Sequence, residues 1–162
     1  MGRLIPGFLA LLLTLPSTVA AGQTAAAPWR RTIHVRVYDG KTGSQIAPSM
    51  LIIRINQQAP IHADWVKMHF DGSAEVSVPA SASVISIQAS YDSSTEVYIN
   101  CDTDAVQTIS NRHWYKVSDI LDTGVTPPNL CKPGRHAVIP DLKAKPGEFL
   151  FFVRKRSWRE ED

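Results

Sequence analysis

VKMHFDGSAEVSV, residues 66–78, is the stretch that decides the fold class of this chain. On both sides of Asp71-Gly72, apolar residues alternate with polar ones, which is the pattern of a half-buried strand. An Asp-Gly pair between two such runs is the strongest short-range signal for a β-hairpin. The stretch therefore predicts strands over 66–70 and 74–78, joined by a tight turn.

Five further segments carry a strand pattern. Residues 32–38 alternate apolar and polar side chains, and the turn residues 39–43, with two glycines able to adopt positive φ, separate them from the next segment. Short strands punctuated by turns predict an all-β, seven-stranded antiparallel sandwich with an Ig-like arrangement. The five segments are 32–38, 49–56, 84–89, 96–101 and 148–153.

A long insertion, residues 102–145, precedes the last predicted strand. Its prolines forbid regular structure over much of its length, and connections this long are usually functional or need a covalent tie. One short helix is expected over 117–121, with Ser118 capping its first turn and Gly124 ending it.

The first residues are typical of a secretory signal peptide. Arg3 gives a positive start, residues 4–15 are apolar, and small residues follow up to Gly22. The apolar run is shorter than the roughly 20 residues that a membrane-spanning helix needs. We expect cleavage near Ala20 to Gly22 and a secreted or periplasmic protein without a permanent membrane span. Residues 1–21 are then the signal peptide, 22–31 a flexible lead, 32–155 the sandwich and 156–162 a charged tail.

Cys101 and Cys131 are the two cysteines of the chain. In an exported protein they meet oxidising conditions, which predicts a disulfide that closes the insertion. On the chain-entropy estimate, such a loop stabilises the fold by about 3 to 4 kcal/mol. The alternatives are a free nucleophilic cysteine and a two-cysteine metal site, but the wide spacing lacks the close pairing of zinc motifs.

Composition limits the classes of function. With 162 residues, 44% of them hydrophobic, the chain can form one ordinary globular domain. Its 17 Lys and Arg are nearly balanced by 15 Asp and Glu, so nucleic-acid binding is not expected. In the tail, basic residues are followed at once by acidic ones, and their charges cancel beyond a Debye length.

The common catalytic motifs do not occur in the sequence: neither a Gly-x-Ser-x-Gly elbow, nor His-Glu-x-x-His, nor a phosphate-binding glycine loop. His62, Asp64 and His69 are close in sequence, but strand alternation turns His69 outward. Asp102 and Asp104 offer too few oxygens for calcium. We expect no catalytic residue, no metal and no cofactor.

Aromatic residues supply the candidate binding surface. His113, Trp114 and Tyr115 lie within the insertion, and Trp65 precedes the third predicted strand. Exposed Trp and Tyr side chains can stack on sugar rings or anchor a protein partner. The alternative is that Trp114 folds back over one edge of the sandwich and serves as a small core for the insertion.

The stretch VYDGKTGSQI (37–46), the Asp71-Gly72 turn and the run 84–89 resemble carboxypeptidase regulatory-like domains. The resemblance covers about residues 32–101, with 149–153 as a natural last strand. It implies a transthyretin-like (prealbumin-like) β-sandwich of non-catalytic character. The transthyretin-like hydrolases of the urate pathway share that fold but end in Tyr-Arg-Gly-Ser, which this chain lacks.

The expected function is therefore a non-catalytic binding or structural role in the cell envelope, with a protein or envelope glycan as partner. Two alternatives stay open. One is a small transthyretin-like hydrolase, because His34 and Arg36 lie on the same face of the first predicted strand. The other is a carbohydrate-binding module that uses the exposed aromatic side chains.

Overall fold

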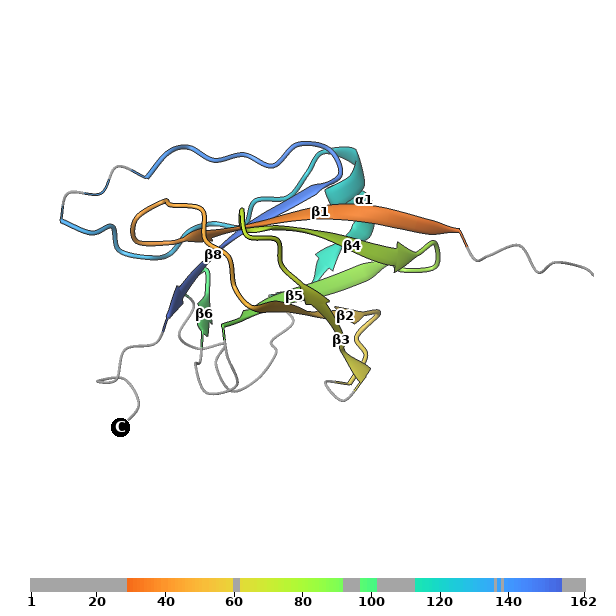
Figure 1. Ribbon diagram of the computed structural model, residues 1–162. Coiled ribbons are helices and arrows are strands. Elements are labelled where there is room, and N and C mark those ends of the chain that lie inside the picture. Colours follow the sequence, from red (N-terminus) through yellow and green to blue (C-terminus); the bar gives the residue numbers. More distant parts are fainter. Residues whose placement is uncertain are drawn as a thin grey trace, which may run out of the picture.

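The computed structural model describes residues 29–59, 62–91, 97–101, 113–135, 137 and 139–155 (Figure 1). The predicted signal peptide, the charged tail and part of the insertion lie outside the described residues. Within them, no helix is long and apolar enough to cross a membrane.

Strands make up most of the regular secondary structure of the described residues. Each of the seven predicted segments overlaps a strand, although the predicted strand 66–70 shares only Val66 and Lys67 with β3; the two-residue strand β7 was not predicted. Arg30 and Arg31 belong to the first strand rather than to the lead, because they pair with Pro79 and Val78. The elements are β1 Arg30–Asp39, β2 Met50–Ile55, β3 Asp64–Lys67, β4 Ser73–Pro79, β5 Val84–Ser90, β6 Val97–Ile99, β7 Tyr115–Lys116, α1 Val117–Asp122 and β8 Glu148–Lys155.

The strands form two four-stranded sheets, ordered β4-β1-β8-β6 and β3-β2-β5-β7. All strand pairs in the described part are antiparallel except β1 and β8, which run parallel. The expectation of a purely antiparallel sandwich is therefore wrong at this pair. β1 and β8 are the first and last described strands, so all the elements between them serve as the long connection that a parallel pair needs.

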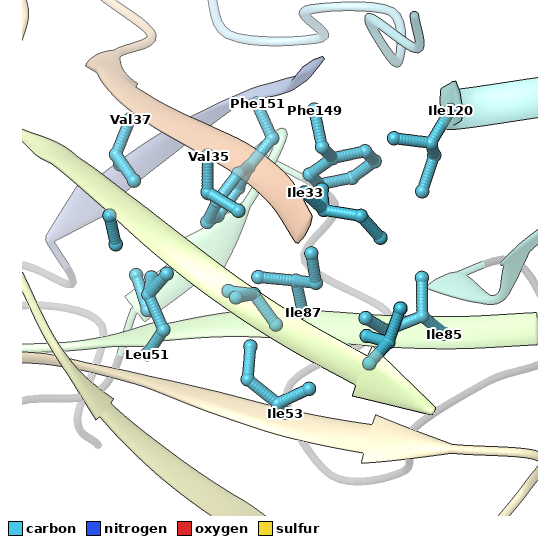
Figure 2. Close-up of a cluster of buried hydrophobic side chains, with 14 of the residues drawn as sticks. Ile33, Val35, Val37, Leu51, Ile53, Ile85, Ile87, Ile120, Phe149 and Phe151 are labelled. Carbon is cyan, nitrogen blue, oxygen red and sulfur yellow. The ribbon is translucent and has the colours of Figure 1, made fainter. Parts of the chain in front are cut away.

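The core lies between the two sheets. Apolar side chains from β1, β2, β5 and β8 point toward one another, and Ile120 of α1 closes one end (Figure 2). Ile33, Val35 and Val37 are fully buried, as the alternation in 32–38 predicts. Period-2 alternation thus identifies the buried face of β1 correctly.

Helix α1 matches the predicted helix, but its cap does not. Lys116 is the N-cap residue and makes no side-chain cap hydrogen bond, while Ser118 lies inside the helix. The start is set instead by docking on β5, because Val117 N–H donates to the carbonyl oxygen of Ser83 at 2.9 Å. Gly124, with φ of 77°, follows the helix as expected.

The described residues of the segment 126–146, namely 126–135, 137 and 139–146, run along the outer face of β1 and β8 (Figure 1). A second small core forms beneath them. Tyr38, Leu150 and Phe152 are buried on this face, and Leu142 and Ala144 pack against them. We call this region the covered side. Here the insertion acts as a cover for a sheet that would otherwise expose aromatic side chains to water.

The predicted Cys101–Cys131 disulfide is confirmed and ties the covering segment to the end of β6. Cys131 packs against Gly40: a Cβ atom on that glycine would lie 2.0 Å from the Cys131 sulfur. Of the two turn glycines 40 and 43, Gly43 alone has positive φ, so the expectation of positive φ at both is wrong. Gly40 is needed for space rather than for its backbone conformation.

The Asp71-Gly72 turn forms as predicted, but the hairpin opens immediately beyond it. His69 N–H donates to the carbonyl oxygen of Ser73 at 2.8 Å, and Gly72 has φ of 78°. Beyond the turn, β3 pairs with β2 in one sheet and β4 pairs with β1 in the other (Figure 1). The prediction that the two strands pair with each other is wrong, because each buries its apolar side chains by joining a different sheet.

Candidate functional site

The opening between β3 and β4 is a cleft of about 460 Å³, which we call the β3–β4 cleft. It lies along one open side of the sandwich, where the edge strands of the two sheets diverge. Its lining combines apolar, aromatic and charged side chains. The lining residues are Arg30, Ile53, Asp64, Trp65, Val66, Glu75, Val76 and Ser77.

Apolar side chains form the inner part of the cleft. Ile53 and Val76 belong to the main core, and Val66 is partly buried against it. Strand register accounts for this arrangement, because Val66 lies opposite the buried Leu51 and therefore faces the interior. An apolar group entering the cleft would meet the edge of the core.

The entrance carries charges of both signs. The guanidinium of Arg30 donates from Nε to the Ser77 hydroxyl at 2.6 Å and from Nη2 to the Ser77 carbonyl oxygen at 2.7 Å. The Asp64 and Glu75 side chains are exposed. His34 Nδ1 lies 3.8 Å from Glu75 Oε1 on the outer face. Arg30 keeps its positive charge while Ser77 holds it, so an incoming ligand meets one guanidinium and two carboxylates.

Strand β4 has backbone N–H and C=O groups that point toward the cleft and are not bonded to another strand. His34 N–H donates to Gly147, on the β8 side of β1, whereas Val37 N–H donates to Gly72, on the β4 side. By the alternation of an antiparallel ladder, residues 74, 76 and 78 then bond to β1. The N–H and C=O groups of Glu75 and Ser77 point away from β1.

Strand β3 has the same property on the opposite wall. Asn56 N–H donates to Val84, so the even-numbered residues of β2 bond to β5 and the odd-numbered ones to β3. The backbone groups of Trp65 and Lys67 therefore point away from β2. Four residues thus have backbone groups on a free edge: Trp65, Lys67, Glu75 and Ser77. Within the described part of the chain, these groups take part in one hydrogen bond, in which the Ser77 carbonyl oxygen accepts from the Arg30 guanidinium.

Trp65 is the predicted binding residue that the structure places at the cleft. Its side chain is 58% exposed. The predicted cluster of His113, Trp114 and Tyr115 does not join it there. Tyr115 turns into the core against Phe149, with ring centroids 4.7 Å apart, and His113 is buried. The predicted binding surface is thus divided, because Trp65 lies in β3 and Tyr115 in β7, which form opposite edges of one sheet.

Trp114 lies partly buried on the outer face of the β3-β2-β5-β7 sheet. The Arg54 guanidinium carbon is 4.8 Å from the centre of its ring. Arg54 is only 5% exposed, and burial lowers the pKa of its guanidinium. This contact holds Trp114 against the outer face of the sheet, so it is not a free platform.

Another pocket, of about 370 Å³, adjoins the disulfide. Lys41 and Lys132 are among its lining residues, together with Arg154, Leu130 and the two cysteines. This pocket is basic and lies at the end of the covered side. The cysteines are joined to each other and are not available as nucleophiles or metal ligands.

His34 and Arg36 make separate contacts, with Glu75 for His34 and with Glu148 and Tyr38 for Arg36. Arg36 donates from Nη1 to the Tyr38 hydroxyl at 2.6 Å and holds both carboxylate oxygens of Glu148. Neither His34 nor Arg36 lines the β3–β4 cleft or the pocket beside the disulfide. The guanidinium that a hydrolase would need for its substrate is already occupied within the covered side.

Metal-binding residues do not gather among the described residues. No group of three or more His, Cys, Asp or Glu side chains placed to hold an ion occurs there, so His62, Asp64 and His69 stay apart. Asp102 and Asp104 lie outside the described residues. Arg30 and Glu75, which shape the cleft entrance, were not singled out by sequence reasoning, because they read as ordinary exposed positions of alternating strands.

Comparison of the chain with protein-family models, curated proteins and solved structures finds no match. The resemblance to carboxypeptidase regulatory-like domains therefore stays a prediction.

Proposed function

We propose that this protein is an exported, non-catalytic β-sandwich module of the cell envelope that binds a partner through the β3–β4 cleft. The observation that carries the proposal is the combination of an exposed tryptophan, two carboxylates and unpaired strand backbone around one opening. Exposed aromatic side chains beside polar groups that converge on a concave surface are typical of binding sites.

Export is supported by two independent features. The first residues have the order of a signal peptide, and Cys101 and Cys131 form a disulfide, which persists in oxidising compartments. The disulfide stabilises the side of the molecule away from the β3–β4 cleft. The fold thus combines a braced scaffold with an open edge, as a binding module requires.

A carbohydrate is a second candidate class of ligand. The exposed face of Trp65 can stack on a sugar ring, and the Asp64 and Glu75 carboxylates can accept hydrogen bonds from its hydroxyl groups. This version of the function needs the Trp65 ring itself rather than the backbone edges of the cleft.

The proposal is tested by retention of envelope material on the immobilised mature protein. Three forms are compared: wild type, Trp65→Ala, and Phe70→Ala as a matched control, since Phe70 is fully exposed but does not line the cleft. We expect a component retained by wild type and Phe70→Ala and reduced at least tenfold by Trp65→Ala. Equal retention by all three forms would exclude the cleft as the binding site.

A further inference from the structure

We infer that the β3–β4 cleft takes an extended polypeptide segment, which adds as a strand to the free edge of β4. This inference rests on the proposed function and names its ligand class. It begins from the observation that β3 and β4 separate beyond their turn. In the described part of the chain, the N–H and C=O groups on their free edges have no partner strand.

The backbone edge selects for a peptide. Glu75 and Ser77 present N–H and C=O groups at a two-residue interval, roughly 7 Å at a rise of about 3.4 Å per residue. An extended peptide carries donors and acceptors at the same interval, and addition to an open edge is an established way for sheets to bind chains. A sugar does not carry this repeat.

Arg30 limits where the added strand can pair. Its guanidinium holds the Ser77 carbonyl oxygen, which blunts the edge at that end of β4. The groups left for a ligand are the N–H and C=O of Glu75 and the N–H of Ser77. The site is therefore a short one, matched to a few residues of an extended segment rather than to a long strand.

Strand alternation defines the side chains of the ligand. A residue opposite Val76 faces the interior, where Val66 and Ile53 also lie, so it is apolar. The residue beside it, opposite Glu75, faces outward, and a Lys or Arg there makes a favourable cross-strand pair. Asp64 adds a second carboxylate at the entrance. The recognised pattern is thus an apolar residue next to a basic one in an extended chain.

The test uses synthetic peptides and calorimetry. The probe is a capped eight-residue peptide of alternating Lys and Val, compared with its Glu-Val counterpart and with a form N-methylated on every backbone nitrogen. We expect binding of the Lys-Val peptide, at least tenfold weaker binding of the Glu-Val peptide, and none of the N-methylated form. Equal binding of the Lys-Val and N-methylated peptides would contradict strand addition.

The matched protein variants are Ser77→Pro and Ser77→Ala. Proline removes an N–H that points away from β1, so the β1–β4 ladder stays intact while strand addition is blocked. Alanine keeps the N–H and loses the hydroxyl contact with Arg30. We expect a loss of at least tenfold in peptide affinity for Ser77→Pro and less than threefold for Ser77→Ala, with thermal unfolding used to confirm that both fold. Should Ser77→Pro fail to fold, Glu75→Lys, expected to weaken the Lys-Val peptide at least tenfold, replaces it.

Three further outcomes separate the inference from the proposed function. Soluble envelope glycan that binds in a Trp65-dependent way, with no peptide binding, overturns the inference and leaves the module a carbohydrate binder. A concentration-dependent dimer abolished by Ser77→Pro overturns it in favour of a second copy on the same edge. If neither peptide, nor glycan, nor retained envelope material depends on the cleft, the proposed function itself fails.

Discussion

The covered side and the β3–β4 side of the sandwich differ: aromatic side chains are buried on the first, whereas an aromatic side chain and strand edges are exposed on the second. On the covered side, segment 126–146 lies over β1 and β8, buries Tyr38 and Phe152, and is tied down by the disulfide. On the β3–β4 side, Trp65 is exposed and two strand edges face an opening. The contrast indicates which surface serves stability and which is left for a partner.

The polar contacts follow the same division. On the covered side the Arg36 guanidinium is enclosed by Glu148 and Tyr38, and the Glu148 carboxylate also accepts from the Lys145 backbone N–H at 2.9 Å. At the cleft, the Asp64 and Glu75 carboxylates are exposed to solvent. Enclosed ion pairs brace a structure, whereas carboxylates exposed to solvent, such as Glu75 with His34 nearby, can be reached by a ligand.

The largest expected effect is the loss of an aromatic side chain from the covered side. Phe152 is 4% exposed and packs beside Tyr38, with ring centroids 6.3 Å apart. We expect Phe152→Ala to lower the free energy of unfolding by about 3 to 5 kcal/mol, because it leaves a cavity in the second core. Denaturant unfolding measures the change. A loss of under about 1 kcal/mol would show that the segment is not a true cover.

The disulfide comes next. Replacing both Cys101 and Cys131 with Ser removes the link between the covering segment and the end of β6. We expect a loss of about 3 to 4 kcal/mol, from the loop-closure entropy that the unfolded chain regains. Amide hydrogen exchange should increase in segment 126–146 and stay unchanged in β3. Faster exchange in both places would erase the distinction between the two sides.

The Arg36–Glu148 pair makes the covered side sensitive to acid. Burial raises the pKa of Glu148, but the hydrogen bonds from Arg36 and from the Lys145 backbone outweigh it, so the pKa ends below its ordinary value of 4.5. Because the folded pKa is lowered, this stabilisation is present above the unfolded pKa and is lost as the pH falls through the folded one.

We therefore expect Glu148→Gln to lower stability by about 1 to 3 kcal/mol at neutral pH and to flatten the loss of stability below about pH 5. Thermal unfolding across that range checks it. The Asp71 carboxylate, whose pKa is lowered by hydrogen bonds from Ser73, keeps its own acid dependence in both proteins. Identical pH profiles for the two proteins would mean that Glu148 does not carry the effect.

The smallest expected effect on stability lies at the cleft. Trp65 is 58% exposed, so Trp65→Ala should change the free energy of unfolding by no more than about 0.5 kcal/mol. The same substitution is expected to abolish retention of the partner. A loss of stability comparable to that of Phe152→Ala would show that Trp65 is a structural residue, and the two sides would no longer differ.

Much of the local structure can be predicted from the sequence. Alternation of apolar residues identifies the strands and, in β1, the buried face through Ile33, Val35 and Val37. The Asp71-Gly72 turn and the Cys101–Cys131 disulfide also follow from residue type. Each of these features depends on a short stretch of chain or on two residues of one kind, so local chemistry is sufficient.

The candidate site could not be predicted in the same way. Trp65 was identified by its side chain, whereas Arg30 and Glu75 belong to the site because β1 and β4 pair in one particular register. Tyr115 was expected at the surface and lies against Phe149, since β7 joins the edge of β5. Side-chain type indicates what a residue can do, but the pairing of strands decides where it does it.

From its sequence alone, this protein is a sandwich of short strands closed by one disulfide, since period-2 alternation and paired cysteines are local properties. Only the tertiary structure decided that β8 runs parallel to β1, that Gly40 makes room for Cys131, and that β3 and β4 separate beyond their turn. The reason is physical: alternation determines which face of a strand is buried but not which strand lies beside it. That choice depends on contacts between residues far apart in the chain, and it opens the cleft.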